Sequence, residues 1–258
     1  MVSTEPGTQL MKKLEGKIAL VTGAGRGIGA AIARRLAADG AEVGIHYANS
    51  AETAENLAEA LRVEGGRAFT VQGDLASLED IDRMAAALRE RPGALDILVN
   101  NAGRGSGRGD STLANMPVED YDMIFALNTR GLFFVTQRLL PLLRDDGRII
   151  NFGSTGATAR VRGLAAYAGS KAAVEAFTRI WATELAPRRI TVNTILPGMI
   201  DTDLITDNMG EEVKAVAARH HPWGRIGQPE DMADVVAFLA SEDSRWVNGE
   251  TIVASGGV

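Results

Sequence analysis

The chain has 258 residues, of which 45% are hydrophobic and 23% charged, and a formal net charge of −6 at pH 7. That composition is typical of a globular protein with a sizeable core. The negative charge argues against nucleic acid or an anionic membrane surface as a partner, because both bind basic surfaces. Cysteine is absent, which excludes disulfides, thiolate nucleophiles and thiolate metal ligands.

The first thirteen residues are polar and lack the apolar stretch of about 7–15 residues that marks a signal peptide. We expect a disordered extension over 1–13 and a single domain over 14–258. No window approaches the ~18 consecutive apolar residues of a membrane span. The sequence therefore predicts a cytoplasmic protein with no membrane contact.

Short apolar runs alternate along the chain with segments of helical periodicity, as in repeated strand and helix units. The expected strands are 17–21, 42–47, 68–72, 95–100, 148–153, 190–196 and 251–254, and the expected helices are 28–38, 53–63, 78–88, 118–143 and 167–185. This order predicts an α/β Rossmann fold, a doubly wound parallel sheet of about seven strands with helices on both faces. Segment 200–223, rich in Met, Leu, Ile and Trp, is expected to cover a ligand as a lid.

A glycine-rich segment, Thr-Gly-Ala-Gly-Arg-Gly-Ile-Gly, occupies 22–29 between the first strand and the first helix. Glycines allow close approach of the backbone to a pyrophosphate, and the start of a helix offers free N–H groups and a positive dipole. A tight turn with close helix packing is the alternative. The position between strand and helix favours a dinucleotide site.

The end of the second strand carries no carboxylate before Glu52. A site for NAD(H) usually places an acid there to bind the ribose 2′-hydroxyl. Arg26 in the glycine segment, with Asn49 and Ser50, can instead accommodate a 2′-phosphate. This pattern favours NADP(H) over NAD(H), the alternative being an ordinary solvated arginine beside a turn.

Tyr167 and Lys171 are four residues apart in a predicted helix, so their side chains share one face. An ammonium beside the phenol favours its ionised form and lowers its pKa from about 10. Such a tyrosine can act as an acid or base on an alcohol. The spacing alone is common, but Ser154 ends a predicted strand, where open α/β sheets bind their ligands.

Taken together, these motifs resemble the short-chain dehydrogenase/reductase family over residues 14–258. The ordered set comprises the glycine segment, Asp74-Leu75, Asn100-Asn101-Ala102-Gly103, Asn128, Ser154, Tyr167, Lys171, and Pro197-Gly198 followed by Thr202. The resemblance implies that Tyr167 donates a proton, Ser154 holds the carbonyl oxygen, Lys171 binds the nicotinamide ribose and Asn128 anchors a water. Asp74 and Leu75 would border the adenine, and Ile200 and Thr202 would bind the carboxamide.

The expected catalytic residues are Asn128, Ser154, Tyr167 and Lys171. The expected cofactor-binding residues are Gly23, Arg26, Gly27, Ile28, Gly29, Tyr47, Asn49, Ser50, Asp74, Leu75, Asn101, Ala102, Gly103, Tyr167, Lys171, Pro197, Gly198, Ile200 and Thr202. No metal site is expected.

Within the family the likeness is greatest to 3-oxoacyl-carrier-protein reductases and related NADPH-dependent ketoreductases, and residues 47–50 resemble the 2′-phosphate turn of fungal naphthol reductases. Two segments depart from that pattern. Ala254-Ser255 replaces a common acidic position, and the loop 104–110 is unusually rich in Gly and Arg. These departures leave the subunit contacts near the C-terminus and the natural substrate unassigned.

Several other residues have structural and functional interpretations. His220, His221 and Trp223 follow the expected lid without acidic partners, so we expect them to shape the pocket rim. Phe133, Phe134 and Trp181 fit core packing as well as the helical subunit interface of relatives. The resemblance implies a homotetramer.

The sequence thus predicts an NADP-dependent oxidoreductase that reduces a small carbonyl compound to a secondary alcohol. One alternative is an NAD-dependent dehydrogenase of alcohols, sugars or steroids. The other is a dinucleotide-binding regulator that keeps the fold without turnover, because fold does not dictate function.

Overall fold

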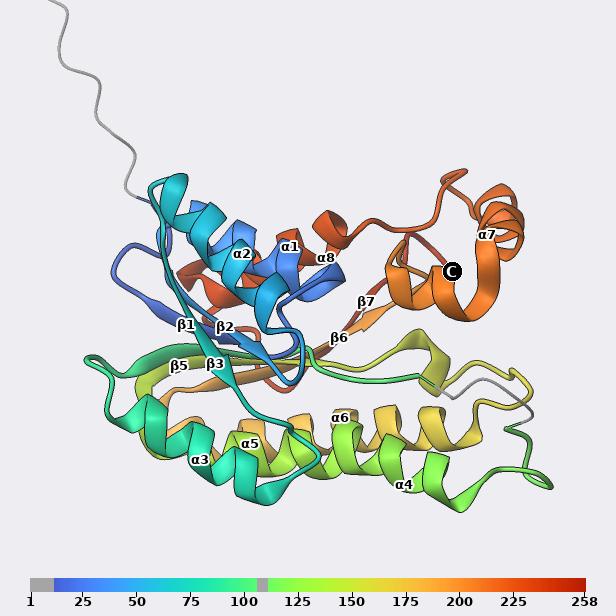
Figure 1. Ribbon diagram of the computed structural model, residues 1–258, viewed down its shortest axis with the longest axis horizontal. Coiled ribbons are helices and arrows are strands. Elements are labelled where there is room, and N and C mark those ends of the chain that lie inside the picture. Colours follow the sequence, from blue (N-terminus) through green and yellow to red (C-terminus); the bar gives the residue numbers. More distant parts are fainter. Residues whose placement is uncertain (1–11, 106–110) are drawn as a thin grey trace, which may run out of the picture.

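The computed structural model describes residues 12–105 and 111–258, and its centre is one sheet of seven parallel strands (Figure 1). The strand order β3-β2-β1-β4-β5-β6-β7 reverses between β1 and β4. Ligands of such sheets bind outside the carboxyl ends of the strands at the reversal. The strands are β1 (Ile18–Val21), β2 (Glu42–Tyr47), β3 (Arg67–Gln72), β4 (Leu95–Asn100), β5 (Leu143–Phe152), β6 (Thr191–Pro197) and β7 (Thr251–Ala254).

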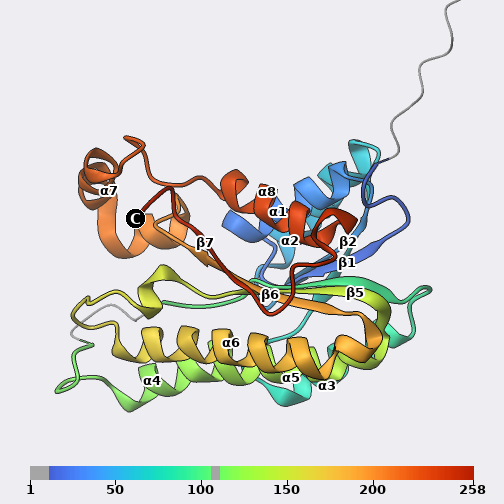
Figure 2. The same cartoon turned by 180° about the vertical axis from the view of Figure 1, so that it is seen from behind.

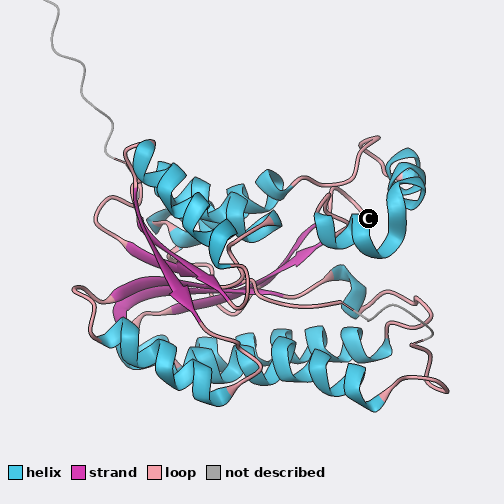
Figure 3. Cartoon of the chain, viewed as in Figure 1, coloured by secondary structure: helices cyan, strands magenta, loops and turns pink. Residues whose placement is uncertain are grey.

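Helices cover both faces of this sheet, as Figure 3 shows by its cyan layers above and below the magenta strands. One face carries α1 (Gly27–Ala38), α2 (Ala51–Val63) and α8 (Pro229–Ala240), and the other carries α3 (Leu78–Arg89), α4 (Val118–Phe125), α5 (Leu132–Leu139) and α6 (Ala165–Glu184) (Figures 1 and 2). α7 (Asp203–His220) stands apart at one end, beside the C-terminus. The expected doubly wound α/β fold of about seven strands is confirmed. Of the N-terminal extension expected over 1–13, residues 1–11 lie outside the described residues.

The core divides between the two faces because successive strand residues point in opposite directions. In β1, Ala19 and Val21 belong to the cluster under α1, α2 and α8, whereas Leu20 belongs to the cluster under α3, α5 and α6. Burying a leucine or valine contributes about 1.5–3 kcal/mol. With both faces covered, the ends of the strands are left for a binding site. Within the described ranges, no helix has the length and apolar character needed to cross a bilayer.

The helix expected over 118–143 is interrupted. α4 runs into a π-helical segment, Ala126–Gly131, before α5, and β5 begins at Leu143 instead of residue 148. A Cβ on Gly131 would lie 2.3 Å from the carbonyl oxygen of Leu75, so only glycine permits this approach to the end of β3. The early start of β5 includes a register shift against β4, with Asp146 at φ 62°. π-helical turns are frequent at functional sites, and this one carries Asn128.

Two helices follow β6 where the sequence pattern had predicted none. α8 begins at Pro229 with a capping box between Gln228 and Asp231, and it packs against α1. α7 occupies most of the segment expected to be a lid; the side chains of residues 203–210 lie outside the described part of the molecule.

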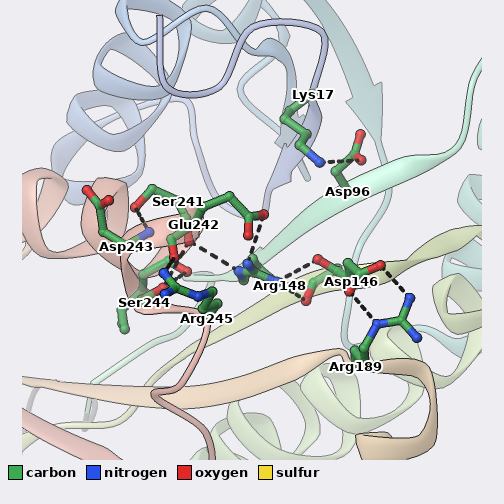
Figure 4. Close-up of polar contacts among 12 residues, drawn as sticks. Lys17, Asp96, Asp146, Arg148, Arg189, Ser241, Glu242, Asp243, Ser244 and Arg245 are labelled. Atoms are coloured by element: carbon green, nitrogen blue, oxygen red, sulfur yellow. Dashed lines mark hydrogen bonds and ion pairs between the residues drawn. The ribbon is translucent and has the colours of Figure 1, made fainter.

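The amino-terminal ends of the strands carry a charged network and no expected site residue (Figure 4). Arg148 is buried, donating to the carbonyl oxygens of Gly147 and Ser241 and to the carboxylate of Glu242. These bonds tie the start of β5 to the chain after α8. Buried Asp96 accepts the N–H of Ile18 at 2.9 Å, which holds β1 beside β4.

Candidate active site

The glycine-rich turn between β1 and α1 has a shape that only glycine allows. Gly23 has φ 63° and Gly27 φ 55°. A Cβ on Gly23 would lie 3.0 Å from the Cα of Ala102, and one on Gly29 would lie 2.4 Å from the carbonyl oxygen of Gly23. The start of α1 lacks a side-chain cap, since Arg26 at the N-cap forms no such hydrogen bond. The first N–H groups of the helix thus have no side-chain acceptor, as in helix ends that bind phosphate.

The end of β4 holds one side of this turn. The Thr22 hydroxyl accepts the backbone N–H groups of Asn101 and Ala102, each at 3.0 Å, and donates to the carbonyl of Val99. The Asn101 amide donates to the carbonyl oxygens of Thr22 and Gly23, at 2.8 and 3.2 Å. The bonds of Asn101 and Ala102 in this structure support the turn, and their expected contact with a nucleotide stays a prediction.

His46, at the end of β2, holds the other side. Its Nδ1 accepts the N–H of Gly23 at 3.1 Å, and its Nε2 contacts the carbonyl oxygen of Gly73 at 2.9 Å. Burial lowers the pKa of His46 to about 4, against the raising effects of Gly73 and the Asp74 carboxylate. His46 belongs to none of the motifs recognised in the sequence. Its only signal in the sequence is a lone histidine inside an apolar strand.

Arg26 lies in the glycine turn, and the other residues expected near the ribose and the adenine lie at or after the ends of β2 and β3. Arg26, Asn49 and Ser50 are exposed, Tyr47 is half-buried, and Asp74 is exposed after β3 while Leu75 is buried. Asp74 accepts the N–H of Ala76 at 2.9 Å, which shapes the local turn. Arg26, Asn49 and Ser50 are thus exposed, and their contact with a ribose phosphate stays a prediction.

Ser154 and Tyr167 meet at the carboxyl end of β5. Tyr167, on α6, lies beside Ser154, since a Cβ on Gly156 would be 3.3 Å from Tyr167 Cε1 and 3.1 Å from Ser154 Oγ, and Ser154 Oγ accepts the N–H of Gly156 at 3.0 Å. Burial raises the pKa of Tyr167, and the Ser154 side chain lowers it. Lys171 is not among the groups that act on this pKa in the structure. The net pKa of Tyr167 is raised, so the lowering expected from the spacing of Tyr167 and Lys171 is not found in this structure, where the Lys171 ammonium is bonded to the Phe152 carbonyl.

Lys171 lies one turn further along α6 and is buried. Its ammonium donates to the carbonyl oxygen of Phe152 at 2.8 Å, and burial lowers its pKa to about 8. A Cβ on Gly103 would lie 3.2 Å from both Lys171 Nζ and Asn128 Oδ1. The glycine thus leaves room beside the ammonium.

The side chain of Asn128 joins the loop after β4 to α6. Its Nδ2 donates to the Arg104 carbonyl and the Ser170 hydroxyl, and its Oδ1 accepts the N–H of Arg104 at 2.9 Å. Both amide protons are used, so the side chain can hold a water only through the second lone pair of Oδ1. The water-anchoring role stays a prediction.

The segment that follows β6, residues 197–202, lies beside the glycine turn and the loop after β5. Pro197 ends β6 and its carbonyl accepts the Thr155 hydroxyl at 3.1 Å, while Ile200 is buried and pairs with Gly227. Thr202 occupies the N-cap position of α7 without a side-chain capping bond, and its methyl group would lie 3.4 Å from a Cβ on Gly27. The structure therefore brings this expected cofactor segment to the glycine turn.

The remaining candidates have structural contacts. His221 Nε2 contacts the Ser255 carbonyl at 2.9 Å and its Nδ1 accepts the N–H of Trp223, beside a cavity of about 300 Å³. The expectation that His220, His221 and Trp223 shape the rim of the substrate pocket stays a prediction. Trp181 is 8% exposed and contacts Phe133 edge to face, so these rings pack in the core under α5 and α6. No group of three or more metal-binding side chains occurs in the described ranges.

A glycine turn of this shape, with a Ser, Tyr and Lys group at the same sheet edge, defines an α/β oxidoreductase site of the dinucleotide-binding class. Residues 23–258 match the family described as enoyl-(acyl carrier protein) reductase. The chain belongs to the short-chain dehydrogenase/reductase family.

The chain is similar to reductases and dehydrogenases of this family. The chain is 39% identical to a hydroxynaphthalene reductase-like protein, Arp2, of Metarhizium brunneum, covering 95% of this chain and 96% of that one. A short-chain dehydrogenase of Burkholderia cenocepacia, solved in complex with NADP, is 40% identical with TM-score 0.88, covering 95% and 98%. The angucycline C-6 ketoreductase LanV, solved with bound NADP, is 41% identical with TM-score 0.88, covering 95% and 96%.

Proposed function

We propose that the protein reduces a ketone to a secondary alcohol with NADPH as the hydride donor and Tyr167 as the proton donor. The observation that carries the proposal is the proximity of half-buried Tyr167 to Ser154: a Cβ on Gly156 would lie 3.3 Å from Tyr167 Cε1 and 3.1 Å from Ser154 Oγ. The similarity to NADP-bound structures, including a ketoreductase, supports the cofactor and the reaction class.

The residues present fit a phosphorylated dinucleotide. A Cβ on Gly23 or Gly29 would collide with neighbouring backbone and Gly27 has a positive φ, so the tight turn needs these glycines, and the start of α1 that it leads into has no side-chain cap. Arg26 is exposed at that point, and the end of β2 lacks a carboxylate that would repel a 2′-phosphate. Asp74 and Leu75 would border the adenine, Asn101, Ala102 and Gly103 the adenosine and ribose, and Ile200 and Thr202 the carboxamide.

The bound NADPH would supply the hydride for the carbonyl carbon. Ser154 would hold the carbonyl oxygen by a hydrogen bond, and Tyr167 would give its phenolic proton to that oxygen as negative charge develops there. Lys171 would bind the nicotinamide ribose, and its ammonium would favour the phenolate that remains. Asn128 would hold a water through which Tyr167 is reprotonated by way of Lys171.

The assembly we propose is a homotetramer in the cytoplasm. Large apolar side chains are exposed on the edge strand β7, in the chain before it and on α8: Val253 is 58% exposed, Trp246 96% and Phe238 43%. Contiguous exposed apolar surface marks protein contacts. Light scattering on the purified protein tests this, with four chains expected and a monomer contradicting it.

The test of the activity is the consumption of NADPH, followed by absorbance, with a panel of activated ketones and β-ketoesters. NADH in place of NADPH is the matched control. We expect turnover with NADPH and a large preference over NADH. Tight binding of NADPH without turnover of any ketone would favour a regulator, and a strong preference for NADH would favour an NAD-dependent dehydrogenase.

A further inference from the structure

The ring of His46 connects the ends of three strands. It is 2% exposed in β2, accepts the N–H of Gly23 after β1 through Nδ1, and contacts the carbonyl oxygen of Gly73 after β3 through Nε2. A carbonyl can only accept, so the proton of the neutral ring must be on Nε2. The backbone carbonyl of His46 also accepts the N–H of Ala24 at 2.9 Å.

These bonds orient the peptide groups on both sides of Gly23. His46 holds the N–H of Gly23, and the Asn101 amide holds its carbonyl oxygen. The glycine itself, at φ 63°, would otherwise be free to move among many conformations. Of these two supports, Asn101 belongs to the motif that the sequence revealed, whereas His46 belongs to no motif.

We propose that His46 is a positioning residue for the pyrophosphate turn: its Nδ1 fixes the Gly23 peptide in the orientation that binds the dinucleotide. The proposal rests on the proposed function for the identity of the ligand. It concerns binding, so it does not depend on which ketone is reduced.

A packing residue and a positioning residue respond differently to two matched substitutions. In His46→Asn the amide oxygen can take the place of Nδ1 and accept the Gly23 N–H, whereas in His46→Gln the longer amide can take the place of Nε2 and donate to Gly73. Loss of this acceptor leaves the part-buried Gly23 N–H without its partner. We therefore expect His46→Gln to weaken NADPH binding about tenfold and His46→Asn to keep it within about threefold.

The pH dependence of NADPH binding also distinguishes a positioning role of His46 from a packing role. A protonated ring would direct Nδ1–H at the Gly23 N–H, two donors facing each other. Asp74 is the charged group that acts on the ring, and it favours protonation, but burial dominates and holds the pKa at about 4. NADPH affinity of the wild type should fall as the pH drops below about 5, in excess of any fall in His46→Asn.

The experiment is a titration of the nucleotide-free proteins with NADPH by fluorescence, at about pH 7 and about pH 4.5, with unfolding curves to verify the fold. Equal affinity of His46→Gln and His46→Asn would overturn the proposal and leave the proposed function intact. Failure of the wild type to bind NADPH and NADH would overturn both.

The ring nitrogens of wild-type His46 give an independent test that needs no variant. Their ¹⁵N chemical shifts should report a neutral ring with the proton on Nε2 from neutral pH down to about pH 5. A proton on Nδ1, or a titration near the ordinary value of about 6.5, would contradict the proposal.

Discussion

Replacing Lys171 with methionine is expected to stabilise the protein while removing its activity. The Lys171 side chain is buried, and burial lowers its pKa from 10.5 to about 8. At about 1.4 kcal/mol per pKa unit, the buried ammonium costs about 3 kcal/mol at neutral pH. Methionine has a similar length and no charge, but it gives up the bond to the Phe152 carbonyl, worth about 1 kcal/mol. The net gain is about 2 kcal/mol, or a rise in Tm of about 4–8 °C.

The stability gain of Lys171→Met over the wild type should shrink as the pH rises. Between about pH 8 and 10.5 the unfolded lysine still holds a proton that the folded one has lost. Wild-type stability therefore rises with pH across that window, and the advantage of Lys171→Met shrinks. Unfolding of both nucleotide-free proteins by denaturant at about pH 7 and about pH 10 measures this. A variant less stable than the wild type at neutral pH would refute the reasoning.

Three further substitutions probe the turn and the far end of the sheet. Arg26→Ala should weaken binding of NADPH about 3- to 10-fold and leave NADH nearly unchanged, because only a 2′-phosphate needs the exposed guanidinium; equal losses in nucleotide titrations would contradict this. Gly29→Ala should weaken NADPH binding more than about tenfold and cost about 1–3 kcal/mol of stability, since its Cβ would meet the carbonyl of Gly23, and normal binding would refute this. Arg148→Leu should cost about 2 kcal/mol by denaturant unfolding with kcat/KM unchanged, because it orphans buried carbonyls far from the site, and an altered kcat/KM would count against that separation.

The fold followed from local patterns to a large extent. Apolar runs of strand length and helical periodicity predicted all seven strands in order, since both signals are carried by neighbouring residues. The π-helical turn was not predictable, because it depends on the contact of Gly131 with Leu75 across the molecule. α8 carried local signals in Pro229 and the Gln228 capping box, and a stricter search for helix starts would have found it.

In the site, too, the residues carried by local motifs were predictable, and the contacts between distant residues were not. The glycine turn, Ser154, Tyr167 and Lys171 are recognisable from type and spacing, and the structure brings them to one sheet edge. The contacts of His46 could not be foreseen, because its partners belong to two other strand ends. The bonds of Asn128 to Arg104 and Ser170 were equally hidden, as they join residues distant along the chain.

The central claim is that Tyr167 delivers the proton in an NADPH-driven ketone reduction. Its most direct test is the single-turnover consumption of bound NADPH by wild type and Tyr167→Phe with an activated ketone. We predict that the rate falls about a hundredfold to ten-thousandfold in the variant, while the Kd for NADPH changes by less than about twofold. An undiminished rate in Tyr167→Phe, at saturating ketone, would contradict the account.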